Sequence, residues 1–179
     1  MRGVFVPSIA SLAFFVLAPG TVAGLVPWRL SGWLFDEPFF SWSGGRVAGG
    51  LLIAAGLAAL VDSFVRFALV GRGTPAPALP TERLVVSGLY RYVRNPMYLA
   101  VASVILGQAA LLGSRPVAWY GALVWCAFHA FVAAYEEPTL RARYGSEYGA
   151  YCEAVRRWLP RVRPWKGVQS PPASQPRRA

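Results

Sequence analysis

The sequence predicts an all-α integral membrane protein with about four transmembrane helices, the last two paired as a helical hairpin and followed by cytosolic C-terminal helices. Two observations carry this prediction. Hydrophobic residues make up 55% of the 179 residues with a mean hydropathy of +0.41, and they gather in long runs. This apolar share exceeds that of an ordinary soluble domain. The net charge of +10 comes from Arg and Lys placed between and after the runs, which favours membrane orientation over a nucleic-acid-binding face.

Four apolar segments define the expected helices in order. Residues 3–27 and 45–70 each exceed the roughly 20 residues that cross a hydrocarbon core. Residues 96–113 and 117–135 are nearer the lower limit for a span, and only residues 114–116 separate them. A connection this short predicts an antiparallel hairpin, in which one helix could be tilted or partly re-entrant.

Charge asymmetry orients these helices. The 71–95 connection and the region from Arg141 to Arg178 are rich in Arg and Lys, whereas the opposite side carries few. Positively charged short loops stay in the cytoplasm. We therefore expect both termini and the 71–95 connection on the cytosolic face of a bacterial inner membrane. A cleaved signal peptide ending near Ala23 is the alternative for the N-terminus, although the apolar run continues past it.

The remaining organisation is simple. Residues 1–163 are expected to form a single membrane domain, and the Pro/Ser/Arg-rich residues 164–179 a disordered basic tail. Because His129 is the only histidine, no metal site is expected. His129 is interpreted as making an interhelical hydrogen bond, with a proton-carrier role as the alternative.

Small residues and one charge pair suggest how the second segment packs. Gly45, Gly49 and Gly50 recur on a helical pattern that lets membrane helices approach closely. Asp62 and Arg66 are four residues apart and can pair on one helix face.

The polar segment before the third apolar run combines a helix start with positive charge. Asn95 is a favoured N-cap and Pro96 a favoured first helical residue. An uncapped helix amino end also attracts anions, and Arg91 and Arg94 add charge there. A capping role and a binding site are both compatible with this pattern.

Two adjacent carboxylates, Glu136 and Glu137, end the fourth apolar run. Neighbouring residues cannot share one helix face, so we expect them to have different partners. One would pair with an Arg of the 91–94 segment, and the other would bind a ligand ammonium or hydroxyl. Pro138 is expected to break the helix or restart it in a new direction. Gly145 then interrupts a stripe of Leu and Tyr that predicts packing against the other helices.

Three motifs in this order resemble the isoprenylcysteine carboxyl methyltransferase family and the wider group that includes phospholipid N-methyltransferases. They are Gly-Leu-Tyr-x-x-x-Arg-Asn-Pro-x-Tyr at 88–98, Glu-Glu-x-x-Leu at 136–140, and Arg-Tyr-Gly-x-x-Tyr-x-x-Tyr at 143–151 with Arg-Trp-Leu-Pro at 157–160. The resemblance covers about residues 80–161. The family commonly has His where this chain has Asn95, a departure that bears on the substrate.

The resemblance implies an integral-membrane methyltransferase that uses S-adenosylmethionine (SAM) and has no Rossmann domain. It also implies a lipophilic small-molecule or lipidated substrate that enters from the bilayer. Arg141 and Arg157 become candidates for orienting this acceptor in catalysis. Carried over by position, the residues lining the cofactor site would be Tyr90, Arg94, Asn95, Pro96, Tyr98, Glu136 and Glu137.

A carboxylate is the favoured acceptor, because it is ionised at neutral pH and needs no strong base. N-methylation of a phospholipid or amine is the alternative. The Tyr-Gly-x-x-Tyr-x-x-Tyr-Cys ending also resembles NADPH-dependent membrane sterol reductases, although those are usually longer. A non-enzymatic small membrane protein is a further alternative. The expected partners are the acceptor and membrane lipids, with no nucleic acid; the oligomeric state stays open.

Overall fold

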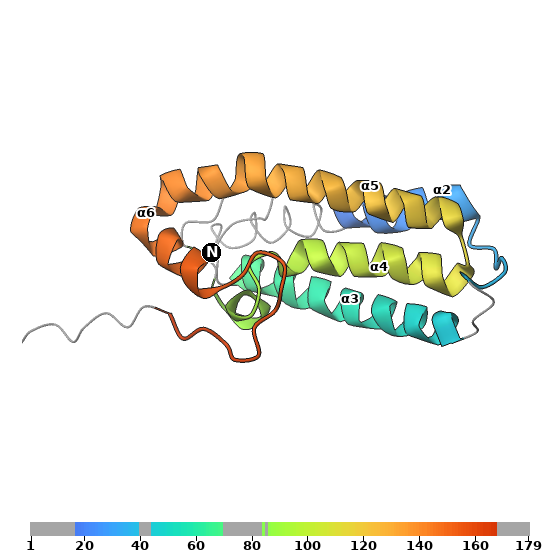
Figure 1. Cartoon of the computed structure of the whole chain (residues 1–179), viewed down its shortest axis with the longest axis horizontal. Coiled ribbons are helices and arrows are strands. Elements are labelled where there is room, and N and C mark those ends of the chain that lie inside the picture. The colour runs from blue at the N-terminus through green and yellow to red at the C-terminus, as the bar shows by residue number, and fades with distance from the viewer. Residues whose placement is uncertain (1–16, 40–43, 70–83, 85, 168–179) are drawn as a thin grey trace, which may run out of the picture.

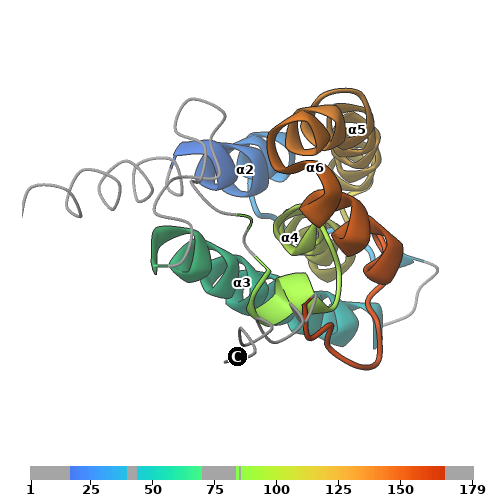
Figure 2. The ribbon, with the colours of Figure 1, turned by 90° about the vertical axis from the view of Figure 1, so that its left-hand side faces the viewer.

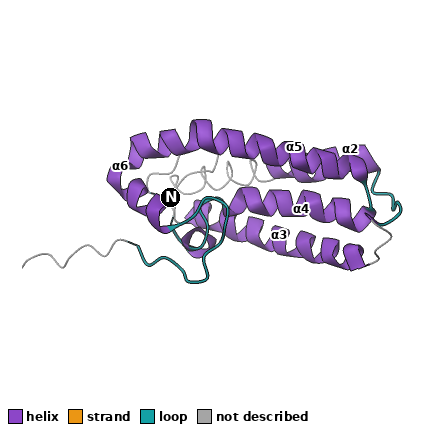
Figure 3. Ribbon diagram, in the orientation of Figure 1, coloured by secondary structure: helices purple, strands orange, loops and turns teal. Residues whose placement is uncertain are grey.

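The computed structural model of the chain describes residues 17–39, 44–69, 84 and 86–167, and every regular element among them is a helix (Figure 1, Figure 3). Two helical stretches, Gly44–Arg66 and Arg115–Ala154, are long and apolar enough to cross a membrane; Pro96–Leu112 is a shorter apolar helix. The all-α prediction is therefore confirmed for the described residues. Four spans remain a prediction, because most of the first one lies outside these residues.

Helices α3 (Gly44–Leu69) and α4 (Pro96–Leu112) lie side by side in opposite directions (Figure 1). Their backbones come very close at two glycines of α3. A Cβ atom added to Gly49 would lie 2.5 Å from the backbone nitrogen of Leu111, and one added to Gly56 would lie 2.8 Å from the carbonyl of Ala100. The predicted packing role is thus confirmed for Gly49, whereas Gly50 faces open space.

The far end of α3 supports the short 3₁₀ helix η3 (Gly88–Arg91). Arg66 pairs with Asp62 at 2.8 Å, which confirms the predicted i,i+4 ion pair. The guanidinium of Arg66 occupies the position that a Cβ atom on Gly88 would take, and Gly88 has a positive φ of 52°. A glycine is therefore needed where η3 begins on α3.

The N-terminal helical segment, with η1 (Thr21–Leu25) and α2 (Val26–Ser31), is tied to α4 through Gln108. This amide is buried in an apolar helix, so each of its polar atoms needs a partner. Its Nε2 donates to the carbonyl of Ala23 at 2.6 Å, and its Oε1 accepts from Trp33 Nε1 at 3.2 Å. Tyr120 of α5 adds a hydrogen bond to the carbonyl of Val22 at 3.0 Å.

After the turn at Gly113, the chain forms one continuous helical run made of α5 (Arg115–Phe131), η4 (Val132–Glu136) and α6 (Glu137–Ala154). The prediction that Pro138 ends or redirects the helix is wrong. The π-helical turn η4 lies just before it, and the Glu137 N–H bonds to the Val132 carbonyl five residues back. Pro138 thus occupies a helix-start position, where its missing N–H costs little.

The change of direction occurs at Gly145 instead, with φ 52° and ψ −125°. This confirms the predicted interruption of α6. Beyond it, Tyr148 and Tyr151 are buried and pack with Val155, so the predicted Tyr stripe does face the protein. Figure 2 shows how the second part of α6 turns back across the end of α4.

Residues 155–167, which we call the return segment, run antiparallel to the residues before α4. Three backbone hydrogen bonds of 2.9–3.0 Å join the two: Arg94 N to Arg156 O, Arg161 N to Tyr92 O, and Trp165 N to Arg91 O. Trp165 also packs on Tyr151 with ring centroids 5.5 Å apart. The expectation of a disordered tail from residue 164 is therefore wrong for Trp165, and residues 168–179 lie outside the described part.

Candidate functional site

The predicted site residues come together at one end of the helices, where α4 begins, α5 passes into α6 and the return segment crosses over (Figure 2). Hydrogen bonds and ion pairs link η3, the first turn of α4, the start of α6 and the return segment. The residues brought together are Tyr90, Arg94, Asn95, Tyr98, Glu136, Glu137 and Arg157. Pro96 is buried beside them as the first residue of α4.

Glu137 is the centre of an ion-pair cluster. Arg157 approaches it in a bidentate manner, with Nε 2.7 Å from Oε1 and Nη2 2.8 Å from Oε2. Arg94 adds a third contact, with Nη1 3.2 Å from Oε1. Because both oxygens of Glu137 are already engaged, this carboxylate joins α6 to the return segment and to the residues before α4. The hydrogen bonds that Arg157 donates to Glu137 also raise the pKa of Arg157 above its ordinary value.

Arg94 retains capacity for a further ligand. Its Nη1 lies 2.6 Å from the sulfur of Cys152, in addition to its contact with Glu137. Its Nε is buried and has no hydrogen-bond partner among the described residues. A buried guanidinium N–H without an acceptor is costly. An anionic ligand group would satisfy it.

Asn95 precedes α4 as predicted, but it does not cap the helix. Its side chain makes no capping hydrogen bond; Nδ2 instead donates to the carbonyl of Arg157 at 3.3 Å. Its position is therefore confirmed, whereas its capping role is wrong, because the return segment takes up the amide. The first N–H groups of α4 are left without a side-chain cap beside Arg94, which is a favourable position for an anion.

Glu136 points to a different partner from its neighbour, as the sequence predicted. Its Oε2 accepts a hydrogen bond of 2.6 Å from the hydroxyl of Tyr98, and no described residue bonds to its Oε1. Tyr90 lies close enough for the charge of Glu136 to affect its phenol, and burial is the main cause that raises the pKa of Tyr90. Tyr90 is further fixed by Tyr151, whose hydroxyl donates to the Tyr90 carbonyl at 2.7 Å.

The two residues proposed for the acceptor are placed differently. Arg157 lies inside the cluster and donates two hydrogen bonds to Glu137. Arg141 is exposed one turn after Glu137, near enough for its charge to act on that carboxylate. No hydrogen bond or ion pair from Arg141 joins it to the described cluster.

An aromatic group that the sequence did not predict lies beside this cluster. The ring of Trp158 lies 4.7 Å from Trp125 and 6.5 Å from Tyr98, measured between centroids, and Tyr98 lies 4.8 Å from Phe128. Trp158 also donates from Nε1 to Nδ1 of His129 at 3.1 Å. The Arg-Trp-Leu-Pro motif could have indicated Trp158, because this residue directly follows the candidate Arg157.

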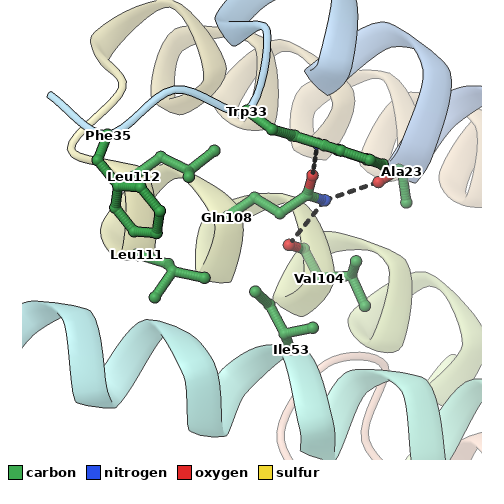
Figure 4. A pocket seen from close by; sticks show the side chains of 8 residues that line it. All are labelled: Ala23, Trp33, Phe35, Ile53, Val104, Gln108, Leu111 and Leu112. Carbon is green, nitrogen blue, oxygen red and sulfur yellow. Dashed lines mark hydrogen bonds between the residues drawn. The ribbon is translucent and has the colours of Figure 1, made fainter.

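A cavity of about 380 Å³ lies elsewhere, toward the opposite end of α4 (Figure 4). Its lining is apolar except for Gln108, whose amide already bonds to Trp33 and Ala23. Glu136, Glu137 and the arginines do not line it. This cavity is therefore separate from the candidate site.

The fold and the site together define an all-helical membrane protein with an ion-pair cluster at one end of its apolar helices. Comparison with known families identifies its family. Residues 45–147, more than half of the chain, match the phospholipid methyltransferase family, and the chain belongs to it. Membership implies a membrane methyltransferase. It confirms the resemblance drawn from the motifs, since this family and the isoprenylcysteine carboxyl methyltransferases form one group.

Two further comparisons add little about activity. An uncharacterized protein of Haemophilus influenzae is 36% identical over 64 residues, which are 35% of this chain and 100% of that protein. No solved structure matches the chain.

Proposed function

We propose that this protein transfers a methyl group from SAM to a lipophilic acceptor, most directly a carboxylate, at the cytosolic face of the membrane. The observation that carries the proposal is that two oppositely charged side chains at the site can each make a further hydrogen bond. Among the described residues, the buried Nε of Arg94 has no hydrogen-bond partner, and neither has Oε1 of Glu136. The amino-acid part of SAM is a zwitterion with the complementary groups.

Each group of SAM then has a matching residue. Arg94 and the uncapped amino end of α4 after Asn95 would hold the carboxylate. Glu136 would accept from the ammonium or from ribose hydroxyls, while Tyr98 keeps its other oxygen in place. SAM supplies a methyl group activated by its bond to a sulfonium.

The protein's part in the reaction is alignment. A carboxylate acceptor needs no proton removed, so the site has to orient two reactants and exclude water. Orientation of this kind is worth about 7–11 kcal/mol in well-ordered systems. Arg141 and Arg157 would help to orient the acceptor, because their positive charge favours an anionic group.

The membrane arrangement forms part of the proposal. We propose four spans with both termini and the 71–95 connection in the cytoplasm of a bacterial inner membrane, following the charge asymmetry. The acceptor would enter from the bilayer between the helices. The site would then lie at the cytosolic rim, where SAM is available.

N-methylation of a phospholipid amine is the second candidate, and the family match favours it, since the matched family is described as phospholipid methyltransferase. An amine must lose its proton before it attacks the methyl group. Neither carboxylate is free to take that proton in this arrangement: the oxygens of Glu137 are engaged with Arg157 and Arg94, and the open oxygen of Glu136 is assigned to SAM. We therefore rank the carboxylate first.

Ligand binding and product chemistry test the proposal. We expect purified protein in detergent to bind SAM and not NADPH in calorimetric titrations. With tritium-labelled SAM and a membrane lipid extract, the transferred label should leave as volatile methanol in mild alkali, because methyl esters hydrolyse and N-methyl groups do not. An alkali-stable product would favour the amine. Binding of NADPH alone, or of neither molecule, would overturn the methyltransferase proposal.

A further inference from the structure

His129 is held in an unusual place for a polar side chain. It lies near the end of α5, is exposed, and belongs to the apolar run Arg115–Ala154. One of its nitrogens, Nδ1, accepts a hydrogen bond of 3.1 Å from Nε1 of Trp158, and the two rings lie 6.0 Å apart. The residue therefore has one satisfied nitrogen and one that faces outward.

The partner determines which nitrogen carries the proton. An indole N–H is only a donor, so Nδ1 of His129 has to be the unprotonated acceptor. The single proton of the neutral ring is then on Nε2. A doubly protonated imidazolium could not accept from Trp158, so this contact selects the neutral ring with an outward Nε2–H donor.

The Nε2–H group of His129 lacks a hydrogen-bond acceptor in an apolar environment. None of the described residues accepts a hydrogen bond from Nε2 of His129. His129 lies seven residues before Glu136, or about 10 Å along the helix at 1.5 Å per residue, on the apolar side of the ion-pair cluster. An N–H group facing hydrocarbon without a partner is costly, and polar groups at such a depth are by default functional.

Trp158 connects this donor to the candidate site. It follows Arg157, which is fixed on Glu137 by two hydrogen bonds. Its ring also lies 6.5 Å from that of Tyr98, which bonds to Glu136. The segment that pairs with Glu137 therefore also holds the ring of His129 in place, through Trp158.

We propose that His129 is a positioning residue for the acceptor: its Nε2–H donates to an oxygen of a lipophilic carboxylate that arrives from the bilayer, and Trp158 fixes the tautomer. The inference rests on the proposed function and adds a residue that positions its carboxylate acceptor. Ester formation makes an O–C bond and breaks the S–C bond of the sulfonium, whose electron pair stays on sulfur, and no proton moves. An N–H donor suits a carboxylate, which accepts hydrogen bonds and has no proton to lose. It does not suit an ammonium, which is itself a donor and needs a base.

The single histidine makes the test direct. Protein with ¹⁵N-labelled histidine and no histidine tag gives one imidazole signal set, in which long-range correlation spectra identify the protonated nitrogen. We expect the Nε2–H form in the unmodified chain. Adding palmitate to the detergent solution should move the Nε2 proton resonance downfield, whereas hexadecylamine, of equal chain length, should not.

Variants separate positioning from structure. Trp158→Phe keeps the ring on Trp125 but removes the donor, so the single-tautomer signature should be lost. Cys126→Ser, an exposed change on the same helix, should leave it unaltered. In methyl-transfer assays with palmitate, His129→Leu should raise KM about tenfold with little change in kcat or in the Kd of SAM. His129→Gln retains an N–H donor, so its KM for palmitate should stay close to that of the unmodified chain.

Two results would overturn the inference. One is a proton on Nδ1 in the unmodified chain, and the other is an Nε2 resonance that palmitate leaves unchanged in protein that binds SAM. If SAM does not bind but palmitate still moves the resonance, the proposed function fails while the carboxylate contact stands. The two failures are therefore distinguishable.

Discussion

Replacing Glu137 by glutamine should damage the fold before it damages SAM binding. The carboxylate is 10% exposed and is the shared partner of Arg94, at 12%, and Arg157, at 30%. The amide has nearly the same size but no charge, so both guanidinium groups lose their counter-ion. Removing one partner of a buried ion pair costs about 3–5 kcal/mol. Because Arg157 is partly solvated and glutamine still offers one acceptor oxygen, we expect about 3 kcal/mol, at the low end of that range.

The neighbouring carboxylate provides a matched comparison. No described residue forms an ion pair with Glu136, and its Oε2 accepts a hydrogen bond from Tyr98 at 2.6 Å. A glutamine at 136 can still accept that hydrogen bond, so Glu136→Gln should cost about 1 kcal/mol of stability or less. It should remove a charged partner of the SAM ammonium, however. A hydrogen bond to a charged group is worth about 1.5–3 kcal/mol, which is roughly a 10- to 100-fold rise in the Kd.

Melting and titration in detergent measure both effects. Each variant is melted with and without SAM, and the Kd of SAM is measured by calorimetry at a temperature where all variants are folded. Glu153→Gln, which neutralises an exposed carboxylate of α6, is the control and should change neither quantity. If Glu137→Gln melts like the unmodified chain while its Kd for SAM rises, Glu137 is a ligand contact and not a structural ion-pair partner.

The remaining predictions concern packing. Gly49→Ala places a Cβ atom 2.5 Å from the backbone of Leu111 and should cost about 1–3 kcal/mol, whereas Gly50→Ala meets nothing within 4 Å and should be neutral. Equal melting temperatures for the two variants would contradict the close approach of α3 and α4. Tyr151→Phe leaves the buried carbonyl of Tyr90 without its 2.7 Å donor and should cost about 1–3 kcal/mol. A melting curve unchanged by that variant would mean that another donor replaces the hydroxyl.

Local rules predicted the helices well, because hydropathy and length fix where an apolar helix can run. The start of α4 at Pro96 is of this kind, since proline is favoured at the first helical position. The same rules failed at Pro138. Whether a proline breaks a helix depends on the hydrogen bonds just before it, and the π-helical turn Val132–Glu136 had already rearranged them.

The sequence could predict that these charged residues lie together, but not which of them pair. The sequence correctly indicated that Glu136 and Glu137 have different partners, and that an arginine of the 91–94 segment is one of them. It could not assign Arg157 to Glu137, because 20 residues and the reversal at Gly145 separate the two. For the same reason Asn95 looked like a cap: its actual acceptor, the Arg157 carbonyl, comes from a distant segment.

The charges of the site, taken together, suggest why its two carboxylates are not equivalent. Arg94 and Arg157 carry two positive charges and Glu137 one negative charge, so this cluster retains one net positive charge. Glu136 lies outside the cluster and retains one net negative charge beside Tyr98. A site with one spare charge of each sign matches a zwitterion better than an anion or a cation. Glu137→Gln would raise the positive charge, so a loss of SAM affinity in that variant would have to come from a loosened return segment, and not from weaker attraction for the carboxylate.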